Sequence, residues 1–407
     1  MNTSRKKTWP VIAAAGGILL ITMGARQTLG LFVAPLNQAT GLGIVAISFA
    51  LAVGQFFWGA VQPIFGAIAD RYGAGRMLIA GAVMIATGTV LTTFASGAVA
   101  LTLTLGVLTA GGAGAGSFSI LIGATSQRIA PEKRAFAAGV INAGGSLGQF
   151  LFAPLNQFLI SSFGWVTAMY ATALAAIATI PLIRPLVSGG SHAIASAESV
   201  RTPTLGLREQ LRIAVRDRSY WLLHAGFFTC GFHIAFLVTH LPGEVNLCSL
   251  PASVAAKSLS IIGLANVAGS LTAGWLGNRH RMKWLLFCIY FSRAVAVAVY
   301  LAAPKTSLTF YLFAAVLGFT WLATVPPTAG IVAKLFGVRY LATLFGLTLL
   351  THQIGGFFGA WLGGIALVKF GDFHWMWYAD IALALGAAFV NLPIREAPVL
   401  RVQTATA

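Results

Sequence analysis

The chain has 407 residues, of which 57% are hydrophobic and only 9% are charged, and its formal net charge is +17. A soluble domain carries roughly 25% charged residues, so this composition excludes a water-soluble fold and indicates a protein embedded in a lipid bilayer. The basic residues are scattered between apolar runs, which argues against nucleic acid as a partner and favours positively charged loops on one side of a membrane.

Apolar runs of about 20 or more residues predict twelve membrane spans. The first follows the basic segment "MNTSRKKTWP" and is too long for the apolar core of a cleaved signal peptide, so we expect it to be retained. The predicted spans are 9–36, 44–69, 76–96, 98–124, 134–160, 165–186, 219–242, 254–277, 283–303, 307–332, 340–368 and 374–393.

The loop charges predict the orientation of these spans. Of the 26 lysines and arginines, 21 fall in the segments that share a side with the N-terminus, three fall in the segments on the other side, and two lie within spans. Positive charge is retained on the cytoplasmic side. We therefore expect a multi-pass protein of the bacterial inner (cytoplasmic) membrane, with both termini in the cytoplasm.

The longest polar segment divides the chain into two halves. Residues 187–218 begin as a Ser/Gly/Ala-rich linker and end in "LREQLRIAVRDR", which is typical of an amphipathic helix at a membrane face. The predicted units are therefore an N-terminal six-helix bundle at 1–186, a cytoplasmic linker at 187–218 and a C-terminal six-helix bundle at 219–407.

The two halves also resemble each other in sequence. "GAIADRYGAGRM" after span two recurs as "GWLGNRHRMK" after span eight, and "GGSLGQFLFAPLNQFLISSFG" in span five aligns with "HQIGGFFGAWLGGIALVKFG" in span eleven. The two matches lie at nearly the same offset along the chain. Internal repeats of this kind are typical of secondary transporters, which bind substrate between the halves near the middle of the membrane.

The loop after span two resembles the signature of the major facilitator superfamily, G-x-x-x-D-R-x-G-x-x-R. Gly66, Asp70, Arg71, Gly73 and Arg76 carry this pattern in the chain. The resemblance extends over essentially the whole sequence and implies an all-α membrane protein, with twelve transmembrane helices in two repeated bundles that rock around a central cavity. It also implies that Asp70, Arg71 and Arg76 form part of a cytoplasmic gate.

Three further segments, "ARQTLGLFVAPL", "CGFHIAFLVTHLP" and "THQIGGFFGAWLGG", resemble a bacterial branch near the monocarboxylate transporters and the oxalate–formate antiporters. The acid–glycine signature in the first span of those monocarboxylate transporters and the span-eight arginine of both groups are missing here. Gln149 also replaces the proline of the span-five motif found in drug antiporters. The resemblance therefore implies a transporter without specifying its substrate.

Polar residues form stripes on two otherwise apolar spans. Their spacing places them on one helix face in each span. Such a face either lines a cavity or hydrogen-bonds to a neighbouring helix, and the pattern leaves both alternatives open. The residues are Gln55, Trp58 and Gln62 in span two, and Asn142, Ser146, Gln149 and Asn156 in span five.

Histidines are the candidate proton carriers, because Asp380 is the only acid within the predicted spans. An imidazole titrates near neutral pH, so we expect His233 or His352 to carry a coupled proton, the alternative being a hydrogen-bonded core residue. No third ligand completes a metal site, and the three cysteines are widely spaced. The sequence therefore predicts neither metal nor cofactor.

The Pro-Pro pair at 326–327 is expected to break span ten, which makes Trp321 and Thr324 candidates for the wall of the cavity.

Arg26 and Arg293 are the two basic residues inside spans. An arginine at membrane depth costs between about 2.5 and about 17 kcal/mol. The family resemblance places Arg26 in a cavity-lining span, where it could bind an anion, snorkel or pair with backbone carbonyls. It places Arg293 on the periphery of its bundle, where pairing with carbonyls or polar groups is expected.

These features predict a secondary active transporter that acts as a monomer on a small organic anion such as a monocarboxylate. Transport would be driven by proton symport or by exchange. An exporter of amphipathic drugs or metabolites is the alternative. The chain contains no Walker motif and no nucleophile elbow, so we do not expect an enzyme.

Overall fold

The computed structural model describes the whole chain except residues 1–2, 127–130, 188–205, 278, 338–339 and 400–407. Every regular element in the described ranges is a helix. Ten helical segments there are long and apolar enough to cross a membrane. Together with α8, which has 33 residues, and α18, which has 18, they correspond to the twelve predicted spans.

The N-terminal half contains spans one to six, several of which are divided into shorter helices. Span four begins with the short helix α5, continues as a π-helical segment, η2, and is interrupted after α6, where the sequence is rich in glycine. The elements are α1 (Thr3–Gln27), η1 (Leu29–Phe32), α2 (Val33–Thr40), α3 (Ile44–Tyr72), α4 (Ala74–Thr92), α5 (Ala98–Leu101), η2 (Thr102–Thr109), α6 (Ala110–Ala115), α7 (Phe118–Ser126), α8 (Pro131–Phe163), α9 (Trp165–Ile177) and α10 (Ile180–Val187).

The C-terminal half contains the linker helix and spans seven to twelve. Span ten is divided as predicted, because two prolines occupy the first turn of α16 and cannot continue the hydrogen bonding of α15. The elements are α11 (Leu207–Arg216), α12 (Arg218–Leu247), α13 (Ala252–Gly277), α14 (Met282–Ala302), α15 (Ser307–Thr320), α16 (Val325–Phe336), α17 (Leu341–Phe370) and α18 (His374–Asn391).

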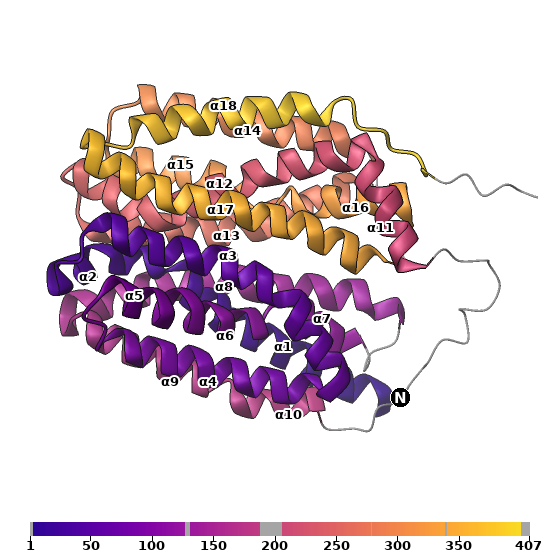
Figure 1. Cartoon of the computed structure of the whole chain (residues 1–407), viewed down its shortest axis with the longest axis horizontal. Helices are drawn as coiled ribbons and strands as arrows, with labels where there is room; N and C mark the ends of the chain where they lie inside the picture. Colours follow the sequence, from indigo (N-terminus) through magenta and orange to yellow (C-terminus); the bar gives the residue numbers. More distant parts are fainter. Residues whose placement is uncertain (1–2, 127–130, 188–205, 278, 338–339, 400–407) are drawn as a thin grey trace, which may run out of the picture.

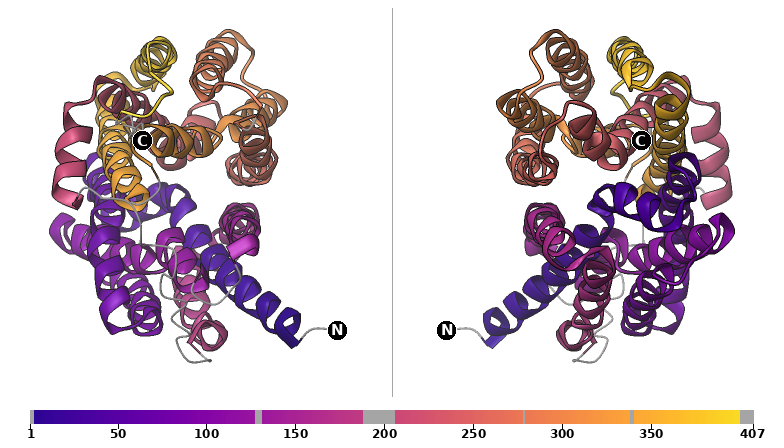
Figure 2. Two further views of the ribbon diagram at one scale, coloured as in Figure 1. Left: turned by 90° about the vertical axis from the view of Figure 1, so that its right-hand side faces the viewer. Right: turned by 90° about the vertical axis from the view of Figure 1, so that its left-hand side faces the viewer.

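The two halves lie side by side, with the N-terminal half at the bottom of Figure 1 and the C-terminal half at the top. The end-on views in Figure 2 show the same division into two groups of helices. The most extensive packing between the halves joins α3 to α17 and α8 to α13. These four helices therefore form the boundary between the two halves.

The predicted repeat is visible in how helices pack within each half. α8 packs on α1 through Gly148, where an added Cβ would lie 2.0 Å from the carbonyl oxygen of Leu20. α17 packs on α12 through Gly355, where an added Cβ would lie 2.0 Å from the carbonyl oxygen of Phe228. Each of these helices ends at a phenylalanine followed by a glycine with positive φ, 83° after α8 and 78° after α17.

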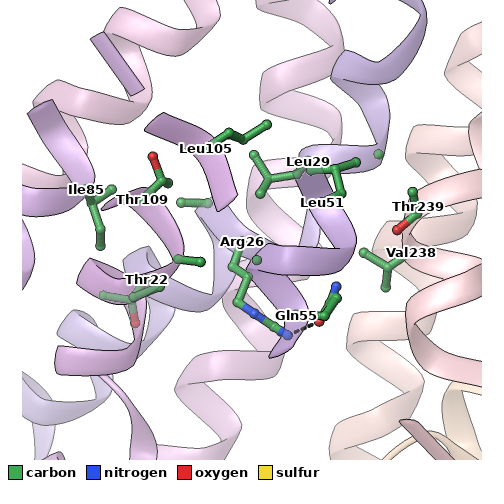
Figure 3. Close-up of a pocket in the computed structure, with 15 residues that line it drawn as sticks. Thr22, Arg26, Leu29, Leu51, Gln55, Ile85, Leu105, Thr109, Val238 and Thr239 are labelled. Atoms are coloured by element: carbon green, nitrogen blue, oxygen red, sulfur yellow. Dashed lines mark hydrogen bonds between the residues drawn. The ribbon is translucent and has the colours of Figure 1, made fainter. Parts of the chain in front are cut away.

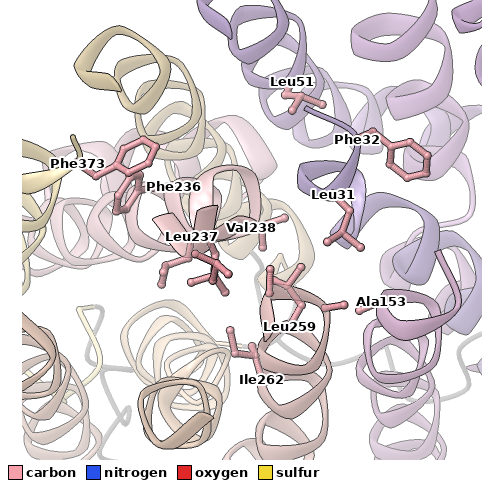
Figure 4. Close-up of a cluster of buried hydrophobic side chains, with 14 of the residues drawn as sticks. Leu31, Phe32, Leu51, Ala153, Phe236, Leu237, Val238, Leu259, Ile262 and Phe373 are labelled. Carbon is pink, nitrogen blue, oxygen red and sulfur yellow. The ribbon is translucent and has the colours of Figure 1, made fainter. Parts of the chain in front are cut away.

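The apolar core differs between the two ends of the molecule. At the end where α10 finishes and α11 lies, which we call the linker end, each half has its own cluster of buried side chains. At the opposite end, one cluster takes residues from both halves; we call it the shared cluster. Figure 4 shows Leu31, Phe32 and Leu51 of the N-terminal half beside Phe236 and Leu259 of the C-terminal half. A small further cluster of Ala52, Ala235 and Ala360 also contains residues of both halves, whereas the two clusters at the linker end are each confined to one half in the described residues.

Candidate functional site

Arg26 lies in the last turn of α1, just before the chain changes to the 3-10 helix η1. Its Nη2 donates a hydrogen bond to Oε1 of Gln55 on α3, and its guanidinium carbon lies 4.1 Å from the centre of the Trp58 ring. Figure 3 shows the Arg26–Gln55 contact. The structure therefore brings together three residues that the sequence placed on two separate spans.

A small cavity surrounds this contact. It is lined mainly by apolar side chains of spans one to four, with Val238 and Thr239 of α12 contributed by the other half (Figure 3). Its volume is about 20 Å³, which is room for about one water molecule. Gly30 closes one side, because its backbone lies so near Val238 that an added Cβ would be 2.0 Å from the Val238 oxygen.

The polar stripe of span five divides into two kinds of residue. Ser146 accepts a hydrogen bond from Nδ2 of Asn266 on α13 at 2.9 Å, and Asn156 donates to Oγ1 of Thr28 at 2.8 Å. These two residues therefore hydrogen-bond to neighbouring helices. Gln149 is fully buried, and neither its amide nitrogen nor its amide oxygen has a partner among the described residues. Asn142, which also lies on α8, is half-buried.

The break in span ten is held by side chains from two other helices. Asn266 Oδ1 accepts a hydrogen bond from the backbone nitrogen of Leu322 at 3.0 Å. Nη2 of Arg293, on α14, donates to the carbonyl oxygens of Thr320 at 2.6 Å and Trp321 at 3.3 Å. Trp321 and Thr324 are themselves buried at this break. The predicted pairing of Arg293 with carbonyls is confirmed, whereas Asn266 was missed, although it is the only amide side chain in span eight.

His233 and Asp380 form a buried pair between α12 and α18. His233 Nδ1 is hydrogen-bonded to Asp380 Oδ2, and both side chains are 0% exposed. His240, about two turns further along α12 on the same face, contacts the carbonyl oxygen of Ala360 at 2.7 Å. The sequence singled out His233 and noted Asp380 but did not pair them, because helical spacing gives no information on contacts between residues 147 positions apart.

His352 lies on α17, between the two charged sites. Its Nδ1 contacts the amide nitrogen of Gln353 at 3.1 Å, and its ring lies 4.9 Å from that of Phe227. The positive charges of both Arg26 and Arg293 act on this imidazole. His352 is therefore electrostatically connected to the N-terminal site and to the break in span ten.

The predicted cytoplasmic gate is described only in part. The backbone turns between α3 and α4 at Gly73, whose φ of 95° suits a residue without a Cβ. Arg76 is exposed near the start of α4, and the side chains of Asp70 and Arg71 lie outside the described residues. Within the described ranges, no three His, Cys, Asp or Glu side chains gather closely enough to hold a metal ion.

Two repeated halves of apolar helices, with charged and polar side chains buried at broken spans between them, define a multi-pass membrane protein with the architecture of a secondary transporter. The sequence profile of the Major Facilitator Superfamily matches residues 15–360 and again residues 249–406. The chain belongs to this family. It is accordingly a transporter-family protein and not an enzyme.

Known relatives agree with the predicted branch. The chain is 27% identical to monocarboxylate transporter 13 of Rattus norvegicus over 371 residues, covering 88% of this chain and 81% of the rat protein. It is 24% identical to the oxalate:formate antiporter of Oxalobacter formigenes over 365 residues, covering 89% and 86%. The crystal structure of a D-xylose-proton symporter matches with a TM-score of 0.73 at 14% identity, covering 96% of this chain and 98% of the symporter. The predicted family and fold are thereby confirmed.

Proposed function

We propose that this protein is a secondary active transporter that moves a small organic anion of monocarboxylate type across the cytoplasmic membrane of a bacterium. It acts as a monomer with both termini in the cytoplasm. The two bundles, 1–186 and 219–407, rock about the substrate and are joined by the linker at 187–218. Transport is driven by proton symport or by exchange against a second anion. Two relatives bear names that refer to small carboxylates.

The observation that carries the proposal is the environment of Arg26. Its hydrogen-bond partner, Gln55, is a neutral amide, and its ring partner, Trp58, is uncharged. No carboxylate in the described ranges forms an ion pair with Arg26. The guanidinium thus keeps a full positive charge and free N–H donors beside a cavity. A carboxylate fits this fork because it can accept two parallel hydrogen bonds.

We propose that Trp58, which lies against Arg26, and Gln149, on the boundary helix α8, supply further polar groups for the same ligand. The indole nitrogen of Trp58 is buried with no hydrogen-bond partner among the described residues, and so are both amide atoms of Gln149. Buried polar groups are nearly always paired in stable proteins. We infer that these groups are paired when substrate or water fills an enlarged cavity, after the halves have moved apart.

The arrangement of the core supports alternating access between two sides. If the linker end faces the cytoplasm, the shared cluster closes the periplasmic end in this conformation. The cavity beside Arg26 is then sealed from that side by the contact of Gly30 with Val238. Its small volume means that an organic anion requires a further movement of the halves before it can bind.

Counterflow in proteoliposomes tests the proposal. Vesicles loaded with one unlabelled monocarboxylate should take up the labelled form, and a panel of carboxylates identifies the substrate class. Arg26→Gln should lower this uptake roughly 10- to 100-fold, because a hydrogen bond to a charged group contributes about 1.5–3 kcal/mol. Arg212→Gln removes the same charge from an exposed position on α11 and should transport normally.

Two results would overturn the proposal. One is an Arg26→Gln variant that carries out carboxylate counterflow at the wild-type rate, which would leave the arginine with a structural role. The other is a wild-type protein that moves no carboxylate but exports amphipathic drugs from vesicles, which would favour the alternative function. Arg26→Lys separates charge from geometry, since lysine keeps the charge but cannot bind a carboxylate as a planar fork.

A further inference from the structure

A buried pair of ionisable side chains lies inside the C-terminal half, and a third charged group from another helix is close enough for its charge to act on the pair. Asp380 comes from α18, His233 from α12 and Arg293 from α14, and each is 0% exposed. His233 Nδ1 is hydrogen-bonded to Asp380 Oδ2, and the charges of both Asp380 and Arg293 act on the imidazole. We call these three residues the Asp380 cluster. The anion site at Arg26 does not include them.

The Asp380 cluster is incompletely hydrogen-bonded. Asp380 Oδ1, His233 Nε2, and Nε and Nη1 of Arg293 are buried without a partner among the described residues. Burying an ion costs several kcal/mol unless its remaining hydrogen-bonding groups are satisfied. A pair that served packing alone would be cheaper as apolar side chains. The unfilled lone pair on His233 Nε2 and the free Oδ1 of Asp380 are instead positions where a proton can be added.

We propose that the His233–Asp380 pair binds the proton that is transported with the anion, and that Arg293 transmits this protonation to the break in span ten. The inference rests on the proposed function and specifies its coupling. In the unloaded state Asp380 is ionised, Arg293 is cationic and neutral His233 donates its Nδ1–H to Asp380, so the cluster carries no net charge. An incoming proton bonds to His233 Nε2, which gives an imidazolium paired with Asp380 and a cluster charge of +1. Release on the other side breaks the same N–H bond.

Further titratable groups lie around the pair on three helices. From α14, the Tyr290 ring lies 5.5 Å from the guanidinium carbon of Arg293. From α12, the Cys230 thiol contacts Thr324 Oγ1 at 3.3 Å. From α17, His352 is affected by the charge of Arg293. Phenols and thiols titrate well above neutral pH, which leaves His233 and His352. Of these two, only His233 is hydrogen-bonded to a carboxylate among the described residues.

Arg293 connects the pair to a part of the chain that can move. It holds the two carbonyl oxygens at the end of α15, where span ten loses its helical hydrogen bonds. A positive imidazolium repels this guanidinium and weakens its hold on the break. On the other side of the break, Leu322 is bonded to Asn266, which in turn donates to Ser146 of the N-terminal half. Protonation can therefore change the contact between the two halves.

The substitution Asp380→Asn separates proton coupling from anion movement. Asparagine preserves the shape and the hydrogen bond to His233, and it gives the cluster the fixed charge of +1 that belongs to the proton-loaded state. We expect at least a tenfold loss of uphill anion accumulation driven by an inward proton gradient. Counterflow, which needs no net proton movement, should stay within about twofold of wild type. Glu244→Gln is the matched control: it neutralises another buried carboxylate, hydrogen-bonded to Tyr300 Oη at 2.7 Å, and should retain both activities.

A direct proton measurement completes the test. Addition of substrate to wild-type vesicles should cause alkalinisation outside, and Asp380→Asn vesicles should show none. His233→Gln should behave in the same way, and it decides the matter if Asp380→Asn does not fold. Undiminished accumulation by these variants would refute the inference, and so would loss of counterflow together with accumulation, which would indicate a structural role. Counterflow without proton movement in wild type would refute the proton site but leave the anion transporter intact, whereas no anion counterflow would refute the proposed function itself.

Discussion

Asn266→Leu is the substitution that best tests how the break in span ten is held. The Asn266 side chain makes three contacts: Nδ2 donates to Ser146 at 2.9 Å, and Oδ1 accepts from the Leu322 backbone at 3.0 Å and from Ser270 at 3.2 Å. Leucine has a similar volume and removes all three hydrogen bonds. Its effect is therefore the loss of polar contacts with little change in packing.

The expected loss of stability depends on whether each former hydrogen-bond partner of Asn266 can form another hydrogen bond. The Leu322 N–H lies at a break, with no helical carbonyl to accept it, so leaving it unpaired costs about 1–3 kcal/mol. The bond to Ser146 is an ordinary interhelical hydrogen bond in a membrane, worth about 0.6 kcal/mol. Because that second bond spans the two halves, its loss should shift their conformational equilibrium by roughly threefold.

Thermal unfolding of the purified protein and counterflow rates together measure these two effects. Asn266→Leu should lower the unfolding temperature by several degrees, whereas Ser146→Ala, which removes only the bond between halves, should change the transport rate with little effect on stability. Adding Ser146→Ala to Asn266→Leu should cost nothing further, because the bond has already gone. If Asn266→Leu were no less stable than Ser146→Ala, Asn266 would not hold the break.

Three further predictions concern packing and polar groups. Gly148→Ala and Gly355→Ala should each destabilise the protein by about 1–3 kcal/mol, because the added Cβ collides with a backbone carbonyl. Gly139→Ala and Gly346→Ala lie on the same two helices with open space beside them, and they serve as controls in the thermal-shift measurement. Gln149→Leu should keep or raise thermal stability, because its amide has no protein partner, while lowering anion affinity measured by substrate-induced thermal shift; unchanged affinity would exclude the amide from the site. His240→Asn should reduce stability without changing the ratio of accumulation to counterflow, since His240 is hydrogen-bonded to the carbonyl of Ala360 and packs on the rings of Phe236 and Phe373, away from the Asp380 cluster.

The sequence predicts features of this protein that depend on one helix at a time. Apolar length predicts the spans, a proline pair predicts the break before α16, and the loop pattern predicts the family. Arg26 was identified from its charge inside an apolar span, and Gln55 and Trp58 from their position on a helix face. The contact among the three residues was not predicted. The His233–Asp380 pair required the relative rotation of α12 and α18, which no periodicity contains. The π-helical segment η2 was missed for a different reason, because its residues are ordinary helix-compatible types.

The different packing at the two ends of the molecule has a consequence for transport. Opening the end that holds the shared cluster exposes apolar side chains from both halves to water, at a cost of about 25 cal/mol for each Å². At the linker end, the two clusters of the described residues are each confined to one half, so opening this end leaves both clusters intact. We propose that other contacts stabilise the closed state of the linker end. The charged candidates are the three residues that the sequence predicts to form a gate: Asp70 and Arg71 at the end of α3 and Arg76 at the start of α4. Salt screens exposed charges but not apolar packing. An increase in ionic strength should therefore shift the equilibrium between the two conformations toward the one that is open at the linker end.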